Sequence, residues 1–397
     1  MAAVLYLTKN GLLEPLGQSQ ILPYLRGLSN KYEFILITYE KFEDRSNTLL
    51  FNKLKAECAL YGIRWVPQNF QTKPRHLIIL FNLFHMFFIG LREARRSDVK
   101  IIHARSYLPT LVALAITQFK KAVFIFDMRA LWPEELIMAK RIKRDSMAHK
   151  LLEFVERKCL KHASGTVSLT NSAIDHLNLI YPKELADKKL KVIPTCVDLK
   201  KFHLNSDIKQ NTLIHGCAGT VLSGWFLTEW LSKWFCQVAM LEPKVKFQII
   251  TRDCVSSVKQ AIDPNESLRN ALTIETKSSS EMPKVFQNQS VSVMFFSPGL
   301  GKIGSAPTRL AEALASGLPI VTNSGVGDVE DIIYDNRVGV ILNSLSEQDI
   351  LKAFKELTYL QQDPGLSLRC RHTAETIFSL EAGIESYQQL YSEIIES

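Results

Sequence analysis

The chain has 397 residues and a mass of 45.1 kDa, with 46% hydrophobic and 22% charged side chains. This size and composition exclude disordered, collagen-like and small disulfide-rich proteins, and they predict two domains. The net charge of +8 is divided unevenly, because residues 1–199 hold 30 Lys and Arg against 18 Asp and Glu, and residues 200–397 hold 18 against 22. The basic half favours an anionic partner such as a membrane surface or a phosphorylated substrate; nucleic acid is least favoured, since no nucleic-acid-binding motif is present.

Short β-branched segments alternate with helical patterns along the chain, which is typical of parallel βαβ units. We therefore predict an α/β fold with two doubly wound, Rossmann-like sheets. In the first half the predicted strands are residues 4–8, 34–39, 63–67, 99–104, 122–127, 165–170 and 190–195. In the second half they are residues 213–219, 246–251, 271–276, 291–296, 319–323 and 338–342. The polar stretch 200–212 is interpreted as a linker, so the predicted domains are 1–199 and 213–363, followed by helices over 364–397.

One apolar segment, Leu77 to Leu91, is too short to span a bilayer and is flanked by arginines. We favour a buried helix there over a helix lying in a membrane interface. A second basic stretch, residues 140–144, together with the charge of the first half, suggests peripheral contact with anionic lipid.

The seven cysteines are scattered without a C-x-x-C pair, which argues for a reducing compartment and against a structural zinc site. The first residues lead directly into an apolar strand, without the features of a signal peptide. We therefore expect a cytoplasmic protein, with a peripheral position on the cytoplasmic membrane face as a further hypothesis.

Ligands of doubly wound sheets bind beyond the carboxyl ends of the strands, so the loops there carry the candidate residues. The loop after the first strand contains two glycines that permit close backbone approach to a ligand, but neither standard nucleotide fingerprint. After strands four and five come an imidazole, guanidiniums and carboxylates that could hold phosphates and move a proton; a structurally satisfied histidine at a strand end is the alternative. These candidates are Gly11, Gly17, His103, Arg105, Asp127, Arg129 and Glu134.

The segment 297–319 combines a glycine-rich loop with the start of a helix. We predict Ser305 as the N-cap and place Pro307 in the first turn, so that free amides meet a phosphate beside Lys302 and Arg309. Glu312, about two turns into this helix, could accept the ribose hydroxyls. A glycine-rich turn that only caps an amphipathic helix is the alternative.

The motifs LGQSQILPYLRGL, HARSY, FDMRALWPEE, VIPTCVD and KIGSAPTRLAEALASGLPIVTNSGVGDVEDI together resemble the family-four retaining glycosyltransferases of the GT-B fold, especially bacterial members that build cell-surface polysaccharides. The resemblance runs from Val4 to Gly339. It implies two Rossmann-like domains facing across a cleft, with a nucleoside-diphosphate (NDP) sugar on the C-terminal domain and the acceptor on the N-terminal one. It also implies no metal or other cofactor, and a C-terminal helix that crosses back to the first domain.

The resemblance assigns roles to single positions. Glu312 matches the second acid of the family's E-x7-E pattern, which binds the ribose, and Gly17 matches the loop glycine near the donor diphosphate. His103 lies in the motif that usually is H-x-H, and Asp127 matches the acid at the end of the next strand.

The chain departs from the family at three places. Gly304 stands where E-x7-E has its first acid, and Arg105 stands where H-x-H has its second histidine. The loop after the first strand of the second half lacks the Arg/Lys pair that binds the diphosphate in many relatives. Lys302 and Arg309 are our candidates to supply that charge.

The sequence therefore predicts transfer of a hexose-type sugar, with retention, to a lipid-linked, lipopolysaccharide or capsule-type glycan in polysaccharide biosynthesis. The alternatives are an NDP-sugar 2-epimerase and a non-catalytic nucleotide-sugar-binding partner of another transferase. The predicted catalytic residues are His103, Asp127, Lys302 and Arg309, and the predicted acceptor-side residues are Gly11, Arg105, Arg129 and Glu134. The predicted donor-binding residues are Gly17, Gly304, Ser305, Ala306, Pro307, Thr308 and Glu312.

Overall fold

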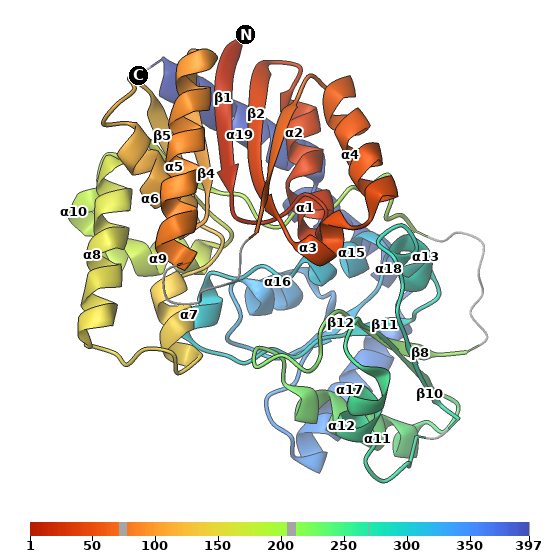
Figure 1. Cartoon of the computed structure of the whole chain (residues 1–397). Helices are drawn as coiled ribbons and strands as arrows, with labels where there is room; N and C mark the ends of the chain where they lie inside the picture. The colour runs from red at the N-terminus through yellow and green to blue at the C-terminus, as the bar shows by residue number, and fades with distance from the viewer. Residues whose placement is uncertain (71–77, 205–211, 269, 397) are drawn as a thin grey trace. The chain divides into compact units, whose positions relative to one another are not determined.

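The computed structural model describes residues 1–70, 78–204, 212–268 and 270–396. They form two compact units, one of Met1–Pro194 with Leu380–Ser397 and one of Thr195–Ser379. Each unit is built on a parallel sheet, which confirms the predicted fold class (Figure 1). The first stretch of the first unit ends at Pro194 and not at the predicted residue 199, because Val197 and Phe202 are buried in the core of the second unit.

The sheet of the first unit has the strand order β3-β2-β1-β4-β5-β6-β7, and all its strand pairs are parallel. The chain begins in the middle of this sheet and builds outward on both sides of β1, which is the doubly wound arrangement. The strands are β1 (Ala2–Thr8), β2 (Tyr32–Glu40), β3 (Arg64–Asn69), β4 (Val99–Arg105), β5 (Val123–Asp127), β6 (Gly165–Ser168) and β7 (Lys189–Val192).

Helices cover both faces of this sheet (Figure 1). The helices are α1 (Pro15–Gln20), α2 (Leu22–Leu28), α3 (Phe42–Arg45), α4 (Thr48–Leu60), α5 (Ile78–Arg96), α6 (Tyr107–Ile116), α7 (Trp132–Met138), α8 (Met147–His162), α9 (Asn171–Ile180), α10 (Pro182–Leu185) and α19 (Leu380–Ile395). On one face α5 packs on β1 and on α6, and α6 also contacts α8. On the other face α19 packs beside α2 and against β4 and β7.

The second unit repeats this plan with the strand order β10-β9-β8-β11-β12-β13. Its strands are β8 (Ile214–Ala218), β9 (Lys246–Ile250), β10 (Leu272–Glu275), β11 (Val291–Val293), β12 (Ile320–Thr322) and β13 (Gly339–Ile341). Its helices are α11 (Thr228–Leu241), α12 (Val255–Ile262), α13 (Met282–Gln287), α14 (Leu300–Ile303), α15 (Thr308–Ala315), α16 (Val329–Asn336), α17 (Glu347–Gln361) and α18 (Leu366–Ile377). Every predicted strand overlaps one of the observed strands.

The helices after residue 364 divide between the units. Helix α18 packs against α15 and α16 in the second unit, whereas α19 belongs to the first. Ile384 of α19 contacts the site of Gly27 on α2 so closely that a Cβ there would overlap it. The predicted crossing back to the first domain is therefore made by α19 alone.

The apolar segment 77–91 differs from its prediction. Leu77 lies outside the described residues, and the rest belongs to α5. The side of α5 that packs on β1 and α6 is buried, as at Met86, but Phe81, Phe84 and Phe88 are 52%, 62% and 64% exposed, so the predicted burial holds for one side of the helix only. In the described ranges, no helix has the length and hydropathy that a transmembrane segment requires.

Candidate functional site

The carboxyl ends of β4 and β5 bring the predicted residues of the first unit together. These strands pair in parallel with Arg105 opposite Asp127, so the two side chains share one edge of the sheet. Arg105 Nη1 lies 3.4 Å from Asp127 Oδ2, and Arg129 Nη1 lies 3.2 Å from Asp127 Oδ1. The sequence therefore placed these groups correctly in one cluster.

His103 and Asp127 form the centre of a buried network. His103 is 1% exposed and Asp127 is 0% exposed. The hydroxyl of Tyr391 on α19 lies 2.6 Å from His103 Nδ1, His103 Nε2 lies 3.1 Å from Asp127 Oδ2, and the Tyr387 hydroxyl lies 3.3 Å from the same carboxylate oxygen. Burial lowers the pKa of His103, which favours a neutral ring that accepts from Tyr391 and donates to Asp127.

The carboxyl of Asp127 stays ionised in this network. Burial acts to raise its pKa, but Arg129, the hydrogen bond from His103, and Arg105 outweigh burial and hold the pKa below its usual range. Since both ring nitrogens of His103 already have partners, the ring has no free atom with which to take a proton from a substrate. The predicted catalytic role of His103 and Asp127 is therefore not supported by their position, and the alternative of a structurally satisfied histidine fits the contacts.

The glycine loop after β1 is organised by a carboxylate and not open to an anion. Glu40 Oε1 accepts a hydrogen bond from the Leu12 amide at 2.8 Å, and Glu40 Oε2 accepts one from the Leu13 amide at 3.0 Å. A Cβ on Gly11 would overlap this carboxylate, and a Cβ on Gly17 would overlap the carbonyl of Gly11. Packing within their own loop therefore explains why glycine occupies these two positions.

The remaining acceptor-side candidates also have protein partners. The Glu134 carboxylate is paired with both terminal nitrogens of Arg144, at 3.1 and 2.5 Å. Arg129 uses Nη1 for Asp127, but its Nη2 is buried and has no hydrogen-bond partner among the described residues. Neither residue lines the cavity found at this edge of the first unit.

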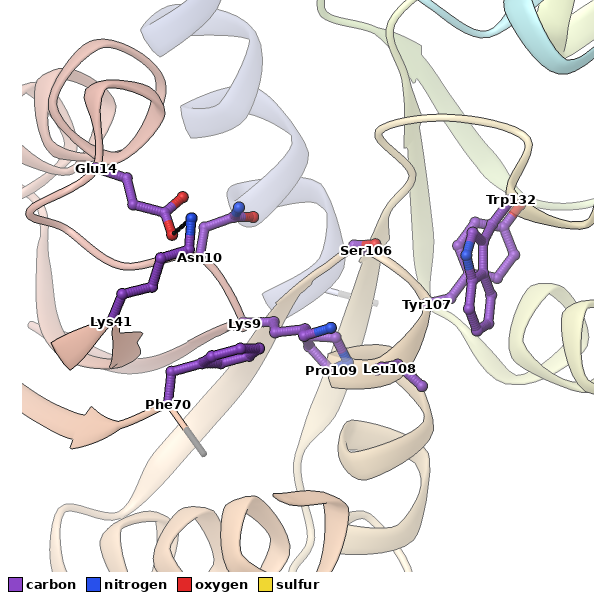
Figure 2. Close-up of a pocket in the computed structure, with 10 residues that line it drawn as sticks. All are labelled: Lys9, Asn10, Glu14, Lys41, Phe70, Ser106, Tyr107, Leu108, Pro109 and Trp132. Carbon is purple, nitrogen blue, oxygen red and sulfur yellow. Dashed lines mark ion pairs between the residues drawn. The ribbon is translucent and has the colours of Figure 1, made fainter. Parts of the chain in front are cut away.

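That cavity has a volume of about 310 Å³ and lies between the loop after β1 and the start of α6 (Figure 2). Lys9 extends over the ring of Phe70 at 5.4 Å, and partial burial lowers the pKa of Lys9, against the opposing effect of Glu14. Lys41 and Glu14 pair at 3.0 Å on the same wall. The sequence singled out none of these four residues, although Lys9 directly follows the first strand and its position was a usable signal.

The opposite wall of this cavity is aromatic. The rings of Tyr107 and Trp132 lie 5.5 Å apart, and Figure 2 shows them side by side. Ser106 joins them from the end of β4 with φ of 76°, a conformation that side chains rarely adopt and that often marks a functional position. Aromatic faces beside hydroxyl, amide and ammonium groups suit a sugar with polar or anionic substituents.

In the second unit the predicted phosphate loop has a different local structure. Helix α15 begins at Thr308 with Pro307 as its N-cap, so the prediction that Ser305 caps the helix is wrong. The reason is that a separate short helix, α14, takes up residues 300–303, and the Ser305 amide bonds back to the Lys302 carbonyl at 3.0 Å. No side chain caps α15, so its first-turn amides keep the capacity to bind an anion.

A second cavity of about 270 Å³ lies at the start of α15. It collects most of the predicted donor residues with both predicted cations: Lys302, Ser305, Ala306, Pro307, Thr308 and Arg309. Its other wall comes from the loop after β8, including Thr220, Ser223 and Trp225. Asp253 fixes that loop, because its Oδ2 accepts from the amides of Val221 and Leu222 at 2.7 and 3.1 Å.

The side chain of Arg309 extends from α15 to the loop after β8. Its guanidinium lies so close to Gly219 that a Cβ there would overlap it, and Gly219 has φ of 106°. The Nη1 atom of Arg309 is buried and has no hydrogen-bond partner among the described residues, and burial lowers the pKa of this guanidinium. Lys302 lies 4.0 Å from the ring centre of Trp225 in the same cavity. A buried cation with an unused donor is a strong attractor for a phosphate oxygen.

Glu312 and Gly304 do not line this cavity. Glu312 is the fifth residue of α15, and not two turns into the helix as predicted. Burial raises the pKa of Glu312 to about 7, although Arg309 opposes this effect. Gly304 ends α14 and is buried.

Solved structures of similar architecture decide the fold. Over 100% of both chains, the protein matches sucrose-phosphate synthase from Thermosynechococcus elongatus with a TM-score of 0.71 at 12% identity. It matches Anabaena HepE in complex with UDP-glucose with a TM-score of 0.68 at 12% identity over 100% of both chains. It also matches the lipopolysaccharide outer core galactosyltransferase WaaB with a TM-score of 0.66 at 10% identity over 99% of both chains. The chain has the GT-B fold.

The GT-B fold rests on architecture and not on sequence likeness. No protein-family model matches the sequence, and no curated protein matches it at a significant level. The Arg309 guanidinium from α15 lies against the loop after β8, which lacks the Arg/Lys pair expected from the resemblance. Sequence reasoning missed Gly219 and Trp225, although a glycine at the end of a predicted strand was a signal for the first.

Proposed function

We propose that this protein transfers a sugar from an NDP-sugar to a hydroxyl of a lipid-linked, lipopolysaccharide or capsule-type glycan, with retention at the anomeric carbon and without a metal. The GT-B fold makes a nucleotide-sugar transferase the first expectation for the chain, as for the transferases of similar structure. We take UDP-glucose as the first donor to test, since HepE was solved with it. The similarity to WaaB supports a lipopolysaccharide-type acceptor.

The observation that carries the proposal is the cavity at the start of α15. In sugar transfer the bond between the anomeric carbon and a diphosphate oxygen breaks, the acceptor oxygen bonds to that carbon, and the acceptor's proton passes to the departing diphosphate. Negative charge therefore develops on the leaving diphosphate as the bond breaks. Preorganised donors that meet this charge are the main catalytic requirement. Arg309, with its unused buried donor, Lys302 and the first-turn amides of α15 supply such donors in one cavity of the second unit.

The ribose is assigned to Glu312, whose carboxylate could accept two hydroxyls. The acceptor is assigned to the cavity of the first unit. Trp132, whose ring packs beside the buried ring of Tyr107, would lie against a sugar ring there, and Lys9 would pair with an anionic substituent such as a phosphate. The buried network of His103 and Asp127 then acts as a support that holds β4, β5 and α19 together, and not as a proton carrier.

The test combines the purified protein with a panel of NDP-sugars and a membrane extract that supplies acceptors. Nucleotide release that depends on both donor and extract supports transfer. Binding of a donor without turnover in any combination supports the non-catalytic partner, and conversion of the NDP-sugar without acceptor supports the epimerase; either result refutes the proposal.

The donor cavity is tested by Arg309→Gln and Lys302→Gln, with Lys284→Gln as a control. Lys284 is an exposed lysine of the same unit on α13 and does not line the cavity. Because a hydrogen bond to a charged group contributes about 1.5–3 kcal/mol, Arg309→Gln should weaken binding of the NDP-sugar by about 10-fold to 100-fold in calorimetry. Equal affinity of Arg309→Gln and the control would contradict the assignment.

A further inference from the structure

The first unit exposes an amphipathic surface that sugar transfer does not use. On α8 the exposed side is formed by apolar residues and lysines at spacings of three and four, which places them on one face of the helix. This α8 face consists of Met147, Lys150, Leu151, Phe154, Lys158 and Lys161. Met147, Leu151 and Phe154 are 82%, 62% and 57% exposed, which is unusual for three large apolar residues on one helix of a globular protein.

The charge around the α8 face is predominantly positive. Residues 140–161 hold eight Lys and Arg against three Asp and Glu. Two of the three acids are already engaged: Glu156 is buried on the opposite side of α8, and Glu153 pairs with His149 at 3.7 Å. Lys150, Lys158 and Lys161 form no ion pair within the described part of the chain, so their charge is available to an anionic partner.

Helix α5 repeats this pattern on the same side of the sheet. Phe81, Phe84 and Phe88 are exposed from near its start to just past its middle, and Arg95 and Arg96 follow at its end. Both α5 and α8 pack on α6, and each leads into a strand of the same parallel sheet. Their apolar first halves therefore lie toward the carboxyl edge of the sheet, and their basic ends toward the opposite edge.

We propose that the α8 face, supported by α5, binds the surface of an anionic lipid bilayer. Large apolar side chains enter the boundary between headgroups and acyl chains, while lysines around them pair with lipid phosphates. A second copy of this chain is less suitable as the partner of the α8 face, because a two-fold contact through this face would bring lysines of one copy against lysines of the other. A protein partner is also less suitable, since lysine is depleted in protein–protein interfaces.

The experiment is vesicle flotation with the full chain and no substrate, so its outcome does not depend on sugar transfer. Vesicles of phosphatidylcholine with phosphatidylglycerol are compared with pure phosphatidylcholine, each at low and high salt. We expect the protein to float with the anionic vesicles at low salt and to be released at high salt, because salt screens the lysines. Equal flotation with neutral vesicles, or none with either, would overturn the proposal.

Two variants of the α8 face separate its contributions. Each lysine near an anionic surface contributes about fivefold to partitioning, so Lys150→Gln/Lys158→Gln/Lys161→Gln should lower partitioning about 100-fold. Leu151→Ser/Phe154→Ser should lower it by about tenfold or more, through loss of apolar insertion. The substituted residues are exposed, so the fold should persist, and near-ultraviolet circular dichroism of each variant verifies this.

The matched control lies on α17 of the second unit, which also exposes two lysines beside a large apolar residue. It is Lys352→Gln/Lys355→Gln/Tyr359→Ser, and Tyr359 is 70% exposed. Flotation of this control should equal that of the unchanged protein. A control that loses as much binding as the α8 variants would overturn the assignment to α8. Sedimentation is run in parallel, and α8 variants that change only the oligomeric state would show that a second copy, and not lipid, covers this face.

Discussion

Glu156 offers a prediction whose size follows from the structure. This residue is 3% exposed on the inner side of α8, where the hydroxyls of Tyr107 and Tyr181 donate to its two carboxylate oxygens at 2.5 and 2.8 Å. Burial raises its pKa from 4.5 to about 7, although the two tyrosine hydrogen bonds act in the opposite direction. Tyr107 also lines the cavity of the first unit, so Glu156 supports a wall of that cavity from behind.

The sign of the pH dependence follows from this raised pKa. In the unfolded chain the carboxyl ionises near 4.5, whereas in the folded chain it ionises near 7. The group therefore favours the folded state fully below pH 4.5, and this contribution is lost as the pH rises through 7. Each pKa unit corresponds to about 1.4 kcal/mol, so the free energy of unfolding should fall by about 3 kcal/mol between pH 5 and pH 8 because of this one residue.

The perturbation is Glu156→Gln, which keeps the shape and removes the ionisation. Urea unfolding of the unchanged protein and of the variant is measured from pH 5 to pH 8.5, and the difference between the two free energies is taken at each pH. This difference cancels every other titrating group, including Glu312 with its pKa of about 7. At pH 5 the variant should be less stable by about 1 kcal/mol through a weaker hydrogen bond, and at pH 8 more stable by about 2 kcal/mol.

The control is Glu33→Gln, an exposed acid on β2 of the same unit. Its difference from the unchanged protein should stay the same across this pH range. If Glu156→Gln also gives a difference that is constant with pH, Glu156 is ionised in the folded protein at ordinary pKa, and the argument from burial fails.

Three further predictions concern the donor cavity and the buried network. Gly219→Ala should weaken NDP-sugar binding by about tenfold or more in calorimetry, because a Cβ at φ of 106° would displace the Arg309 guanidinium. Unchanged affinity would show that the position of Arg309 does not depend on this glycine. Tyr391→Phe should lower the free energy of unfolding by about 1–3 kcal/mol in urea titrations, since His103 Nδ1 is left buried without its partner. A decrease in the free energy of unfolding of less than about 0.3 kcal/mol would contradict a stabilising role for this hydrogen bond. Binding of the NDP-sugar should strengthen from pH 6 to pH 8, because the Glu312 carboxyl ionises through its pKa of about 7. Glu312→Gln should remove this pH dependence of binding. A variant with the same pH profile as the unchanged protein would refute the assignment of the ribose to Glu312.

The strands could be predicted from the sequence because their signal is local. Runs such as Phe34–Tyr39 and Phe247–Ile250 are apolar and β-branched, and they recur between helical stretches at the spacing of βαβ units. In parallel sheets the carboxyl ends of neighbouring strands meet, so the clustering of Arg105, Asp127 and Arg129 also followed from order along the chain. The same argument gathered Lys302 and Arg309 at one helix start.

The sequence by itself therefore determined the fold class, the two sheets and the loops that carry the polar groups, because hydrophobic periodicity and strand order act over short stretches. Only the tertiary structure decided which of those groups face a cavity. Tyr391 and Tyr387, on the last helix, form hydrogen bonds with His103 and Asp127. Glu40 accepts hydrogen bonds from the amides of the glycine loop. No local pattern encodes such partners, since burial and hydrogen bonding are set by side chains that are distant in sequence and meet only in the folded protein.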